Sequence, residues 1–371
     1  MNGKNIKYLE GLNTLRFSAA FLVILYHAHG SLIKLGLMQD TSVPILDKGV
    51  DAVDFFFTLS GFLITYLLLK EISQTNNVSI KKFYTRRALR IWPVYFAIVF
   101  FRFFLYSVVY KFILHIPDTD FPALKGFLMY IFFLPNLAAI IYNVGLLHPL
   151  WSIGVEEQFY LLWAPLVKFF KHKIKFLLLG TTIISIAWYI VVNYNLINFD
   201  SVATEFFLSQ KFYAMNIGAI FGYILFHYID LYSRSFFANK FSQFFFLGFL
   251  IYYYAVTDQL ENYFWLKILI PVFYGVFILN VSVIKNRIIY LEKKPFVFLG
   301  EISYGLYMYH MVIDFFLRKG FQKLIVHNFN HTVLTTVYFI LIIGGTILLS
   351  YISYKYFESW FLKIKHKFSI V

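Results

Sequence analysis

Long apolar stretches alternate with short polar loops along almost the whole chain. Eleven of these stretches approach the roughly 20 residues that a helix needs to cross the hydrocarbon core of a bilayer. The pattern therefore predicts an all-α bundle of membrane-spanning helices. The candidate segments are 11–30, 50–70, 91–113, 123–143, 153–170, 176–194, 206–228, 241–257, 263–283, 297–317 and 333–355.

The distribution of lysine and arginine among the loops predicts the topology, because basic loops stay in the cytoplasm. With the N-terminus inside, the first three segments end outside, whereas the lysines at 168–175 belong inside. The region 121–170 should then hold one net crossing, so either 123–143 or 153–170 is short, re-entrant or tilted. We expect about ten crossings, both termini in the cytoplasm and a polar defect near 143–157.

Composition agrees with this class of protein. Of the 371 residues, 60% are hydrophobic and 14% are charged, and the first apolar segment lacks a signal-peptide cleavage site. The net charge of +14 reflects membrane orientation and not nucleic-acid binding. The chain has no cysteine, which excludes disulfides, thiolate metal sites and a cysteinyl acyl-enzyme. We expect one integral domain over residues 1–371, a retained first helix and no separate soluble domain.

The first apolar segment carries two ionisable side chains, Arg16 and His27. Eleven positions on an α-helix make three turns plus about 20°, so both side chains leave the same face, roughly 16 Å apart along the axis. Ionisable groups in a membrane helix usually face a bundle interior or a wet cavity. His27 is therefore a candidate general base, and Arg16 needs an anionic partner or a wet pocket. A histidine that only bonds a neighbouring helix is the alternative.

The second segment adds a carboxylate and a pair of small residues. Asp54 heads the apolar run on the same predicted side as His27, where it can orient the imidazole as in a catalytic relay. The alternative is an acidic residue favoured by the dipole at a helix N-terminus. Ser60 and Gly61 lie in mid-segment, where a close contact between helices is a better interpretation than a nucleophile.

An arginine cluster precedes the third segment. Arg86, Arg87 and Arg90 are spaced three and four positions apart, which places one cationic patch on a helix at the cytoplasmic membrane surface. Guanidinium groups bind phosphate through two parallel hydrogen bonds, so the patch is a candidate phosphate site. The preference of cytoplasmic loops for basic residues is the competing explanation.

Two more polar groups lie in the second half of the chain. Glu156 and Glu157 are adjacent at the start of an apolar run, and solvent exposure accounts for only one of them. The other is a candidate partner of Arg16 or of a polar substrate. Tyr304 and His310 form a polar stripe in the tenth segment, for which structural hydrogen bonding is the preferred interpretation.

In order and spacing, these blocks resemble the acyltransferase-3 family of integral membrane O-acyltransferases. The resemblance covers nearly the full chain. The stretches that carry it are Leu9–Leu12 with Arg16 and His27, Asp54–Leu63, Arg86–Arg90 before Trp92 and Pro93, Leu150–Tyr160, Ile302–His310 and Tyr356–Glu358.

The resemblance implies a ten-helix core that moves an acyl group, commonly acetyl, from acyl-coenzyme A to a carbohydrate hydroxyl. Arg16 and His27 match the family's arginine–ten residues–histidine motif, and Arg87 and Arg90 match its arginine–two residues–arginine motif. It thus implies direct transfer with His27 as general base, without a metal, and Arg86, Arg87 and Arg90 at the coenzyme phosphates.

The remaining candidates follow from this interpretation. Asp54 and Glu156 complete the expected catalytic set, and the expected acceptor contacts are Trp151, Glu157, Tyr304 and His310. The expected partners are acyl-CoA, a carbohydrate or glycolipid acceptor and the lipid bilayer, in the cytoplasmic (inner) membrane of a bacterium. The oligomeric state stays open.

A rival interpretation is a transporter or flippase of a lipid-linked glycan. Arg16, His27 and Glu156 would then form a substrate or proton path, since proton relays use these residue types. Consumption of acyl-CoA distinguishes the two interpretations.

Overall fold

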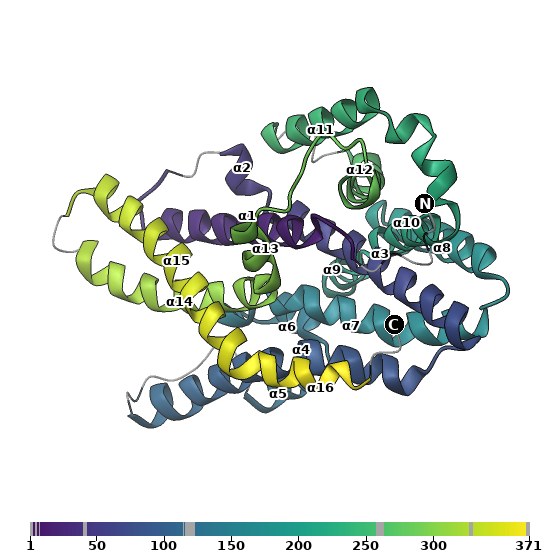
Figure 1. The fold of residues 1–371 in the computed structure, drawn as a ribbon. Helices are drawn as coiled ribbons and strands as arrows, with labels where there is room; N and C mark the ends of the chain where they lie inside the picture. Colours follow the sequence, from purple (N-terminus) through teal and green to yellow (C-terminus); the bar gives the residue numbers. More distant parts are fainter. Residues whose placement is uncertain are drawn as a thin grey trace.

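The computed structural model describes residues 3, 6, 8–39, 43–113, 115, 123–256, 263–325 and 329–368. Most of these residues are helical, and none of them is in a strand (Figure 1). The α-helices are α1 (Leu12–Lys34), α2 (Pro44–Asp47), α3 (Gly49–Thr75), α4 (Ile80–Phe104), α5 (Ala123–Ile131), α6 (Pro135–Ile141), α7 (Leu150–Phe169), α8 (Ile174–Asn193), α9 (Ser201–Ser209), α10 (Phe212–Ser233), α11 (Lys240–Ala255), α12 (Phe264–Val283), α13 (Lys294–Glu301), α14 (Ser303–Ile325), α15 (His331–Ser353) and α16 (Ser359–His366). The π-helical and 3-10 segments are η2 (Leu105–Ile113), η3 (Gly145–Leu147), η4 (Phe236–Ala238) and η5 (Tyr354–Glu358).

The predicted fold class is confirmed, with fewer spans than expected. Within the described residues, seven helices are long and apolar enough to cross a membrane, and the pair α13 and α14, bent by 68°, gives an eighth. Eight of the eleven predicted segments correspond to these spans. Of the other three, 123–143 is broken, 153–170 is made less apolar by its glutamates, and 241–257 forms the 16-residue α11.

Irregular backbone does occur between residues 121 and 170. The predicted segment 123–143 divides into the nine-residue α5 and the seven-residue α6, and η3 and a short turn precede α7. It is therefore the segment before the glutamates that is short. Pro135 begins α6, and the neighbouring α7 covers this helix.

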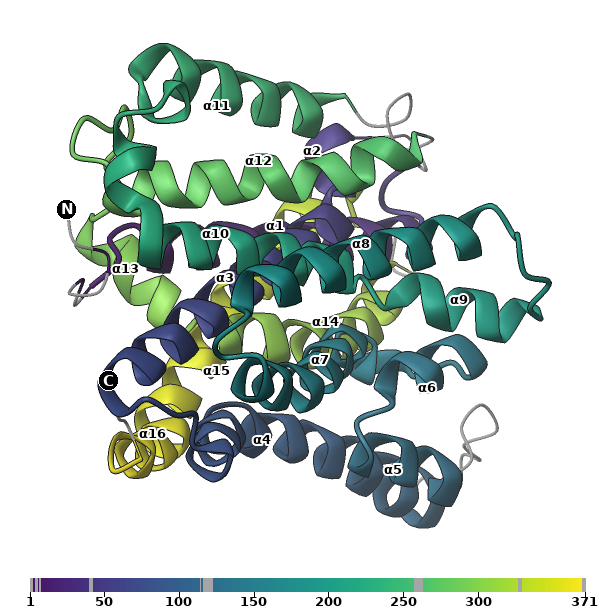
Figure 2. The ribbon, with the colours of Figure 1, turned by 90° about the vertical axis from the view of Figure 1, so that its right-hand side faces the viewer.

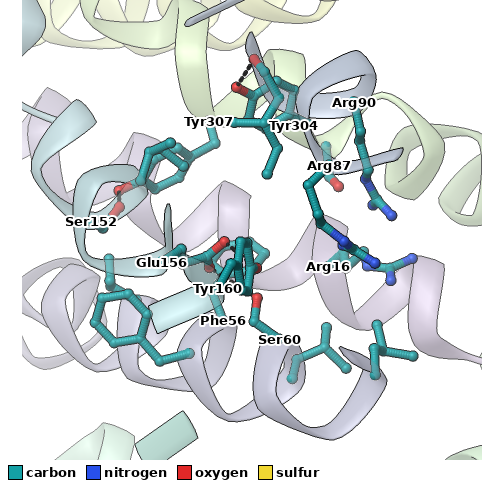
Figure 3. Close-up of a pocket in the computed structure, with 17 residues that line it drawn as sticks. Arg16, Phe56, Ser60, Arg87, Arg90, Ser152, Glu156, Tyr160, Tyr304 and Tyr307 are labelled. Carbon is teal, nitrogen blue, oxygen red and sulfur yellow. Dashed lines mark hydrogen bonds between the residues drawn. The ribbon is translucent and has the colours of Figure 1, made fainter. Parts of the chain in front are cut away.

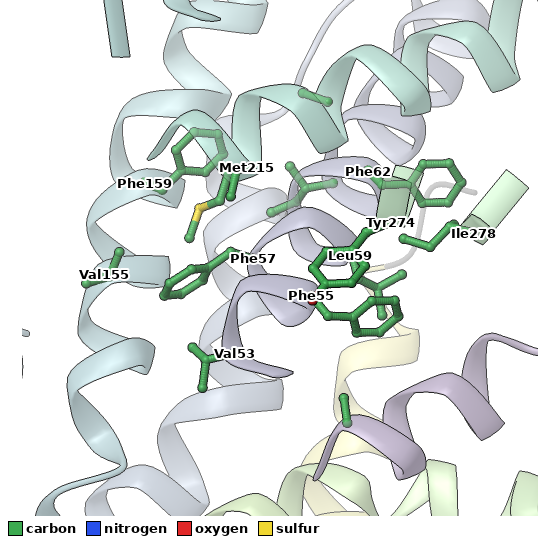
Figure 4. Close-up of a cluster of buried hydrophobic side chains, with 14 of the residues drawn as sticks. Val53, Phe55, Phe57, Leu59, Phe62, Val155, Phe159, Met215, Tyr274 and Ile278 are labelled. Atoms are coloured by element: carbon green, nitrogen blue, oxygen red, sulfur yellow. The ribbon is translucent and has the colours of Figure 1, made fainter. Parts of the chain in front are cut away.

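The centre of the bundle is the contact between α3 and α10. A Cβ added to Gly61 would collide with the backbone carbonyl of Met215, and one added to Gly218 would collide with the carbonyl of Thr58. The predicted close contact at Gly61 is confirmed, and small residues allow the two backbones to touch. Aromatic and aliphatic side chains of α3, α7, α10 and α12 fill the surrounding core (Figure 4).

The C-terminal helix α16 packs against α4, at the same end of the bundle as α13 (Figure 2). The sharp bend between α13 and α14 occurs at Ile302, so that α14 begins inside the molecule. Ser303 and Tyr304, in its first turn, line the cavity described below.

Candidate active site

A cavity between α1, α3, α4, α7 and α14 brings together polar side chains from across the sequence (Figure 3). It encloses about 800 Å³ of space that no atom fills, part of it open to solvent. Aliphatic and aromatic side chains of α3 form much of its wall, including Val53, Phe56 and Leu63. The cavity thus combines an apolar wall with a small set of polar groups.

Three arginines gather on one side of this cavity, opposite Ser152 (Figure 3). Arg16 comes from α1, and Arg87 and Arg90 come from α4; we call these three residues the arginine trio. Arg16 donates a hydrogen bond to Asn13 Oδ1 at 3.0 Å. The like charges repel one another, so the trio creates a positive field suited to an anionic group.

Glu156 occupies the middle of the cavity wall. Its Oε1 accepts a hydrogen bond from Ser60 Oγ at 2.9 Å, and its Oε2 accepts one from Tyr160 OH at 2.8 Å. The Arg87 guanidinium lies over the Tyr160 ring, 5.6 Å from its centroid. Arg16 and Glu156 share the cavity without forming an ion pair in the described part of the chain. The carboxylate is therefore held in place by two hydroxyl groups.

The predicted base His27 lies in a cluster of three histidines. Its ring centroid is 5.1 Å from that of His310 in α14 and 5.7 Å from that of His148, which directly follows η3. His148 is exposed, His27 is half-buried and His310 is fully buried. Within the described residues, no ring nitrogen of His310 has a hydrogen-bond partner, and no group of histidines and acids is arranged to hold a metal ion.

Tyr307 connects the cavity with the histidine cluster. It lines the cavity, and its ring centroid is 6.0 Å from that of His310. Its hydroxyl shares a hydrogen bond of 2.7 Å with Ser152 Oγ and donates to the carbonyl of Pro149 at 3.2 Å. Tyr307 thus lines the cavity and also lies against the histidine cluster, whose three members do not line the cavity.

Arg86, predicted to join Arg87 and Arg90 in one cationic patch, does not line the cavity with them. Its Nη2 forms an ion pair with Glu71 Oε2 at 2.9 Å, and Nη1 donates to the carbonyl of Phe368 at 3.1 Å. Arg86 is absent from the cavity lining because successive helix positions differ by about 100°, which turns it away from Arg87.

The structure also gives Asp54 a different partner from the one expected. Both of its carboxylate oxygens accept hydrogen bonds from Lys211 Nζ, at 2.7 and 2.9 Å. Lys211 lies directly before α10 and reaches the first turns of α3. The carboxylate is buried in an ion pair, so the predicted relay from Asp54 to His27 is not formed.

Three other predicted acceptor contacts lie at different places in the structure. Tyr304 lines the cavity and donates to the carbonyl of Ile91 at 2.7 Å, as expected of a structural hydrogen bond. Trp151 packs edge-on against Phe57, with ring centroids 6.0 Å apart. Trp92 Nε1 donates to Glu157 Oε2 at 3.0 Å, so this glutamate links α7 to α4. Their roles in acceptor binding, like that of His310, stay predictions.

Several side chains of the site were not predicted from the sequence. Tyr160 follows Glu156 by four positions and therefore shares its helix face, which is a signal that could have identified it. Tyr307 likewise precedes His310 by three positions. Ser152 and His148 carry no comparable signal, because only the packing of η3 and the start of α7 against α14 brings them to the site.

The chain is similar in sequence to known proteins over most of its length. The sequence model of a family described as an acyltransferase domain matches residues 9–355. The chain belongs to the acyltransferase family. Curated relatives include the O-acetyltransferase OatA of Staphylococcus aureus strain NCTC 8325 / PS 47, which is 27% identical over 382 residues covering 95% of this chain. OatA of strains COL and MW2 matches to the same extent.

The chain spans a little over half the length of these relatives, since the match covers 57% of OatA. No solved structure matches the chain. Membership in the acyltransferase family extends over the whole membrane core that builds the cavity, because the match begins before α1 and ends just after α15.

Proposed function

We propose that this chain is a membrane O-acyltransferase that moves an acyl group, in the simplest case acetyl, from acyl-CoA to a hydroxyl of a carbohydrate. One observation carries the proposal. A cavity with three arginines at one end continues past Glu156 to Tyr307, whose ring centroid lies 6.0 Å from that of His310 in the cluster with His27 and His148. An anion-binding end and a base-bearing end are what a long, phosphorylated acyl donor requires.

The donor enters from the side of the arginine trio. Guanidinium groups form bidentate, charge-assisted hydrogen bonds with phosphate, and the nucleotide part of coenzyme A carries several phosphate groups. Arg87 and Arg90 lie in the basic first turns of α4, which by the distribution of charge face the cytoplasm. The donor identity is proposed from this chemistry, and acetyl is proposed because the named relatives are O-acetyltransferases.

The uncharged arm of the donor lies along the cavity. Arg16 and His27 are separated by three turns of α1, or roughly 16 Å. An extended arm that begins at the arginine trio therefore places its thioester near Tyr307 and the histidines. The apolar wall from α3 suits such an arm and excludes water from the reactive end.

Transfer then needs one base and no covalent enzyme intermediate. His27 accepts the proton of the acceptor hydroxyl while the oxygen attacks the thioester carbonyl carbon. The tetrahedral intermediate collapses with cleavage of the carbon–sulfur bond, and the imidazolium returns its proton to the leaving thiolate. The products are the ester and free coenzyme A, and His27 is again neutral.

The acceptor reaches His27 from the side of His148. His148 is exposed and His27 is half-buried, whereas His310 behind them is fully buried. This gradient leaves an approach for a hydroxyl group at the end of the site away from the arginine trio. We propose a carbohydrate or glycolipid acceptor, and a bacterial cytoplasmic membrane with both chain ends in the cytoplasm.

The test is His27→Ala in the full chain, reconstituted in proteoliposomes with acetyl-CoA and a carbohydrate acceptor. Loss of a general base should lower the transfer rate by about 100-fold or more. Coenzyme A binding, measured by calorimetry, should stay within twofold of the parent, because the arginine trio is intact. His331→Gln, at an exposed histidine that begins α15, is the matched control and should transfer normally.

Full transfer activity in His27→Ala would contradict the assignment of the base. If the parent protein inserts and folds but neither binds nor consumes acyl-CoA, the proposal that acyl-CoA is the donor is contradicted. That result would favour a transporter. Mass spectrometry of cell-surface glycans with and without the gene checks the reaction in the cell, where the expected change is the loss of one acetyl mass per modified site.

A further inference from the structure

The end of the chain folds back onto the helix that carries two of the cavity arginines. α15 continues through the π-helical turn η5 into α16, and α16 packs against α4 (Figures 1 and 2). The hydrogen bond from Arg86 Nη1 to the carbonyl of Phe368 joins α4 to the residues just after α16. π-Helical turns are often found at functional sites. This one directs α16 onto α4, the helix that carries Arg87 and Arg90.

Lys365 is the residue of α16 that this arrangement places near the arginines. Its charge is repelled by all three members of the arginine trio and by Arg86. It is half-buried, whereas Lys363 and Lys367 on the same segment are exposed. Lys365 does not line the cavity, and α16 extends away from the end of the bundle where α1 finishes after His27 (Figure 1).

The described carboxylates around this cluster do not balance its charge. Glu71 pairs with Arg86, Glu156 is held by two hydroxyl groups, and Glu157 accepts from Trp92 and attracts Arg87. With Glu358, these four carboxylates face five cations, namely the arginine trio, Arg86 and Lys365. Glu358, at the end of η5, accepts from Ser353 Oγ at 2.9 Å and attracts Arg90. Bringing a fourth cation to the trio is unfavourable by itself, and an anionic ligand with more than one charged group would stabilise it.

We propose that Lys365 binds the ribose 3′-phosphate of the acyl-CoA donor and that α16 forms the outer wall of the nucleotide site. The inference rests on the proposed function. It follows from the order of groups along the donor, in which the pyrophosphate lies between the pantetheine arm and the ribose 3′-phosphate. With the thioester at His27 and the pyrophosphate at the arginine trio, the outermost cation meets the outermost phosphate.

The experiment measures binding of coenzyme A and of dephospho-coenzyme A, which lacks the 3′-phosphate, to the detergent-solubilised full chain by calorimetry. Lys365→Ala should weaken coenzyme A binding about tenfold, as expected for loss of one charge-assisted contact, and leave dephospho-coenzyme A binding unchanged. Lys365→Arg should retain most of the affinity. Lys363→Ala, two positions away on the exposed face, should bind both ligands like the parent.

Equal weakening for both ligands, or none for either, would overturn the assignment of Lys365 while leaving the proposed donor intact. A parent protein that binds neither ligand would overturn the proposed donor and this inference together. The melting temperature of each variant is measured alongside. Retention of the parent value in Lys365→Arg keeps the test valid even where the alanine variant is destabilised.

Discussion

Removal of one partner from the buried ion pair between Asp54 and Lys211 should destabilise the fold. The two side chains are 7% and 14% exposed, and the nearest oxygen and nitrogen atoms are 2.7 Å apart. At an effective dielectric constant of about 20, two unit charges at this distance attract each other by about 6 kcal/mol. Much of this offsets the cost of burial, so Lys211→Met should lower the free energy of unfolding by about 3–5 kcal/mol.

The double variant Asp54→Leu/Lys211→Met separates a structural from a catalytic role. It removes both charges, and replacement of a buried ion pair by apolar residues is often neutral, so most of the stability should return. Thermal unfolding of the detergent-solubilised chain, followed by tryptophan fluorescence, measures this, with Lys240→Met at an exposed lysine as the control. We expect the double variant to transfer acyl groups.

Two results would refute this reasoning. An unchanged melting temperature in Lys211→Met would show that the ion pair contributes nothing to the fold. A double variant that is as stable as the parent but inactive would return Asp54 to the catalytic set, as the sequence pattern first indicated.

Two further predictions concern helix packing and the arginine cluster. Gly61→Ala should lower the melting temperature because the new Cβ collides with the carbonyl of Met215. Gly180 has open space around it, so the melting temperature of Gly180→Ala should equal or exceed that of the parent. Equal melting temperatures for the two variants would contradict the packing argument. Arg87→Gln should raise the KM for acyl-CoA about tenfold with little loss of stability, and Arg86→Gln should lower the melting temperature with a KM near that of the parent. Steady-state kinetics and thermal unfolding measure both, and the reverse pattern would contradict the placement of the two side chains.

The helical class and most of the spans could be predicted from the sequence because the physics is local. An apolar run of about 20 residues in a bilayer satisfies its backbone polar groups only as a helix. The break within 123–143 and the bend at Ile302 could not be predicted in detail. Both depend on which neighbouring helices cover the interrupted backbone, and that is a property of the assembled bundle.

Some residues of the candidate site could likewise be predicted from the sequence, and others could not. Arg16, Arg87 and Glu156 were identified because charged side chains beside long apolar runs need a polar surrounding. The partner of Asp54 lies 157 positions away, and no spacing rule connects residues so distant. His148 could not be predicted as a neighbour of His27 for the same reason, since the two rings come together only after the chain has folded.

The number of residues between Arg16 and His27 fixes both the distance between these two side chains along α1 and the face of the helix on which they lie. The chain carries Arg16 at the anion-binding end and His27 at the basic end, within one uninterrupted helix. Inserting one residue between them would advance the histidine by only about 1.5 Å but rotate it by about 100°, away from its neighbours. The number of residues from 17 to 26 is consequently more constrained than their identity. On the proposed function, this part of α1 sets the distance between the phosphates of the donor and its thioester.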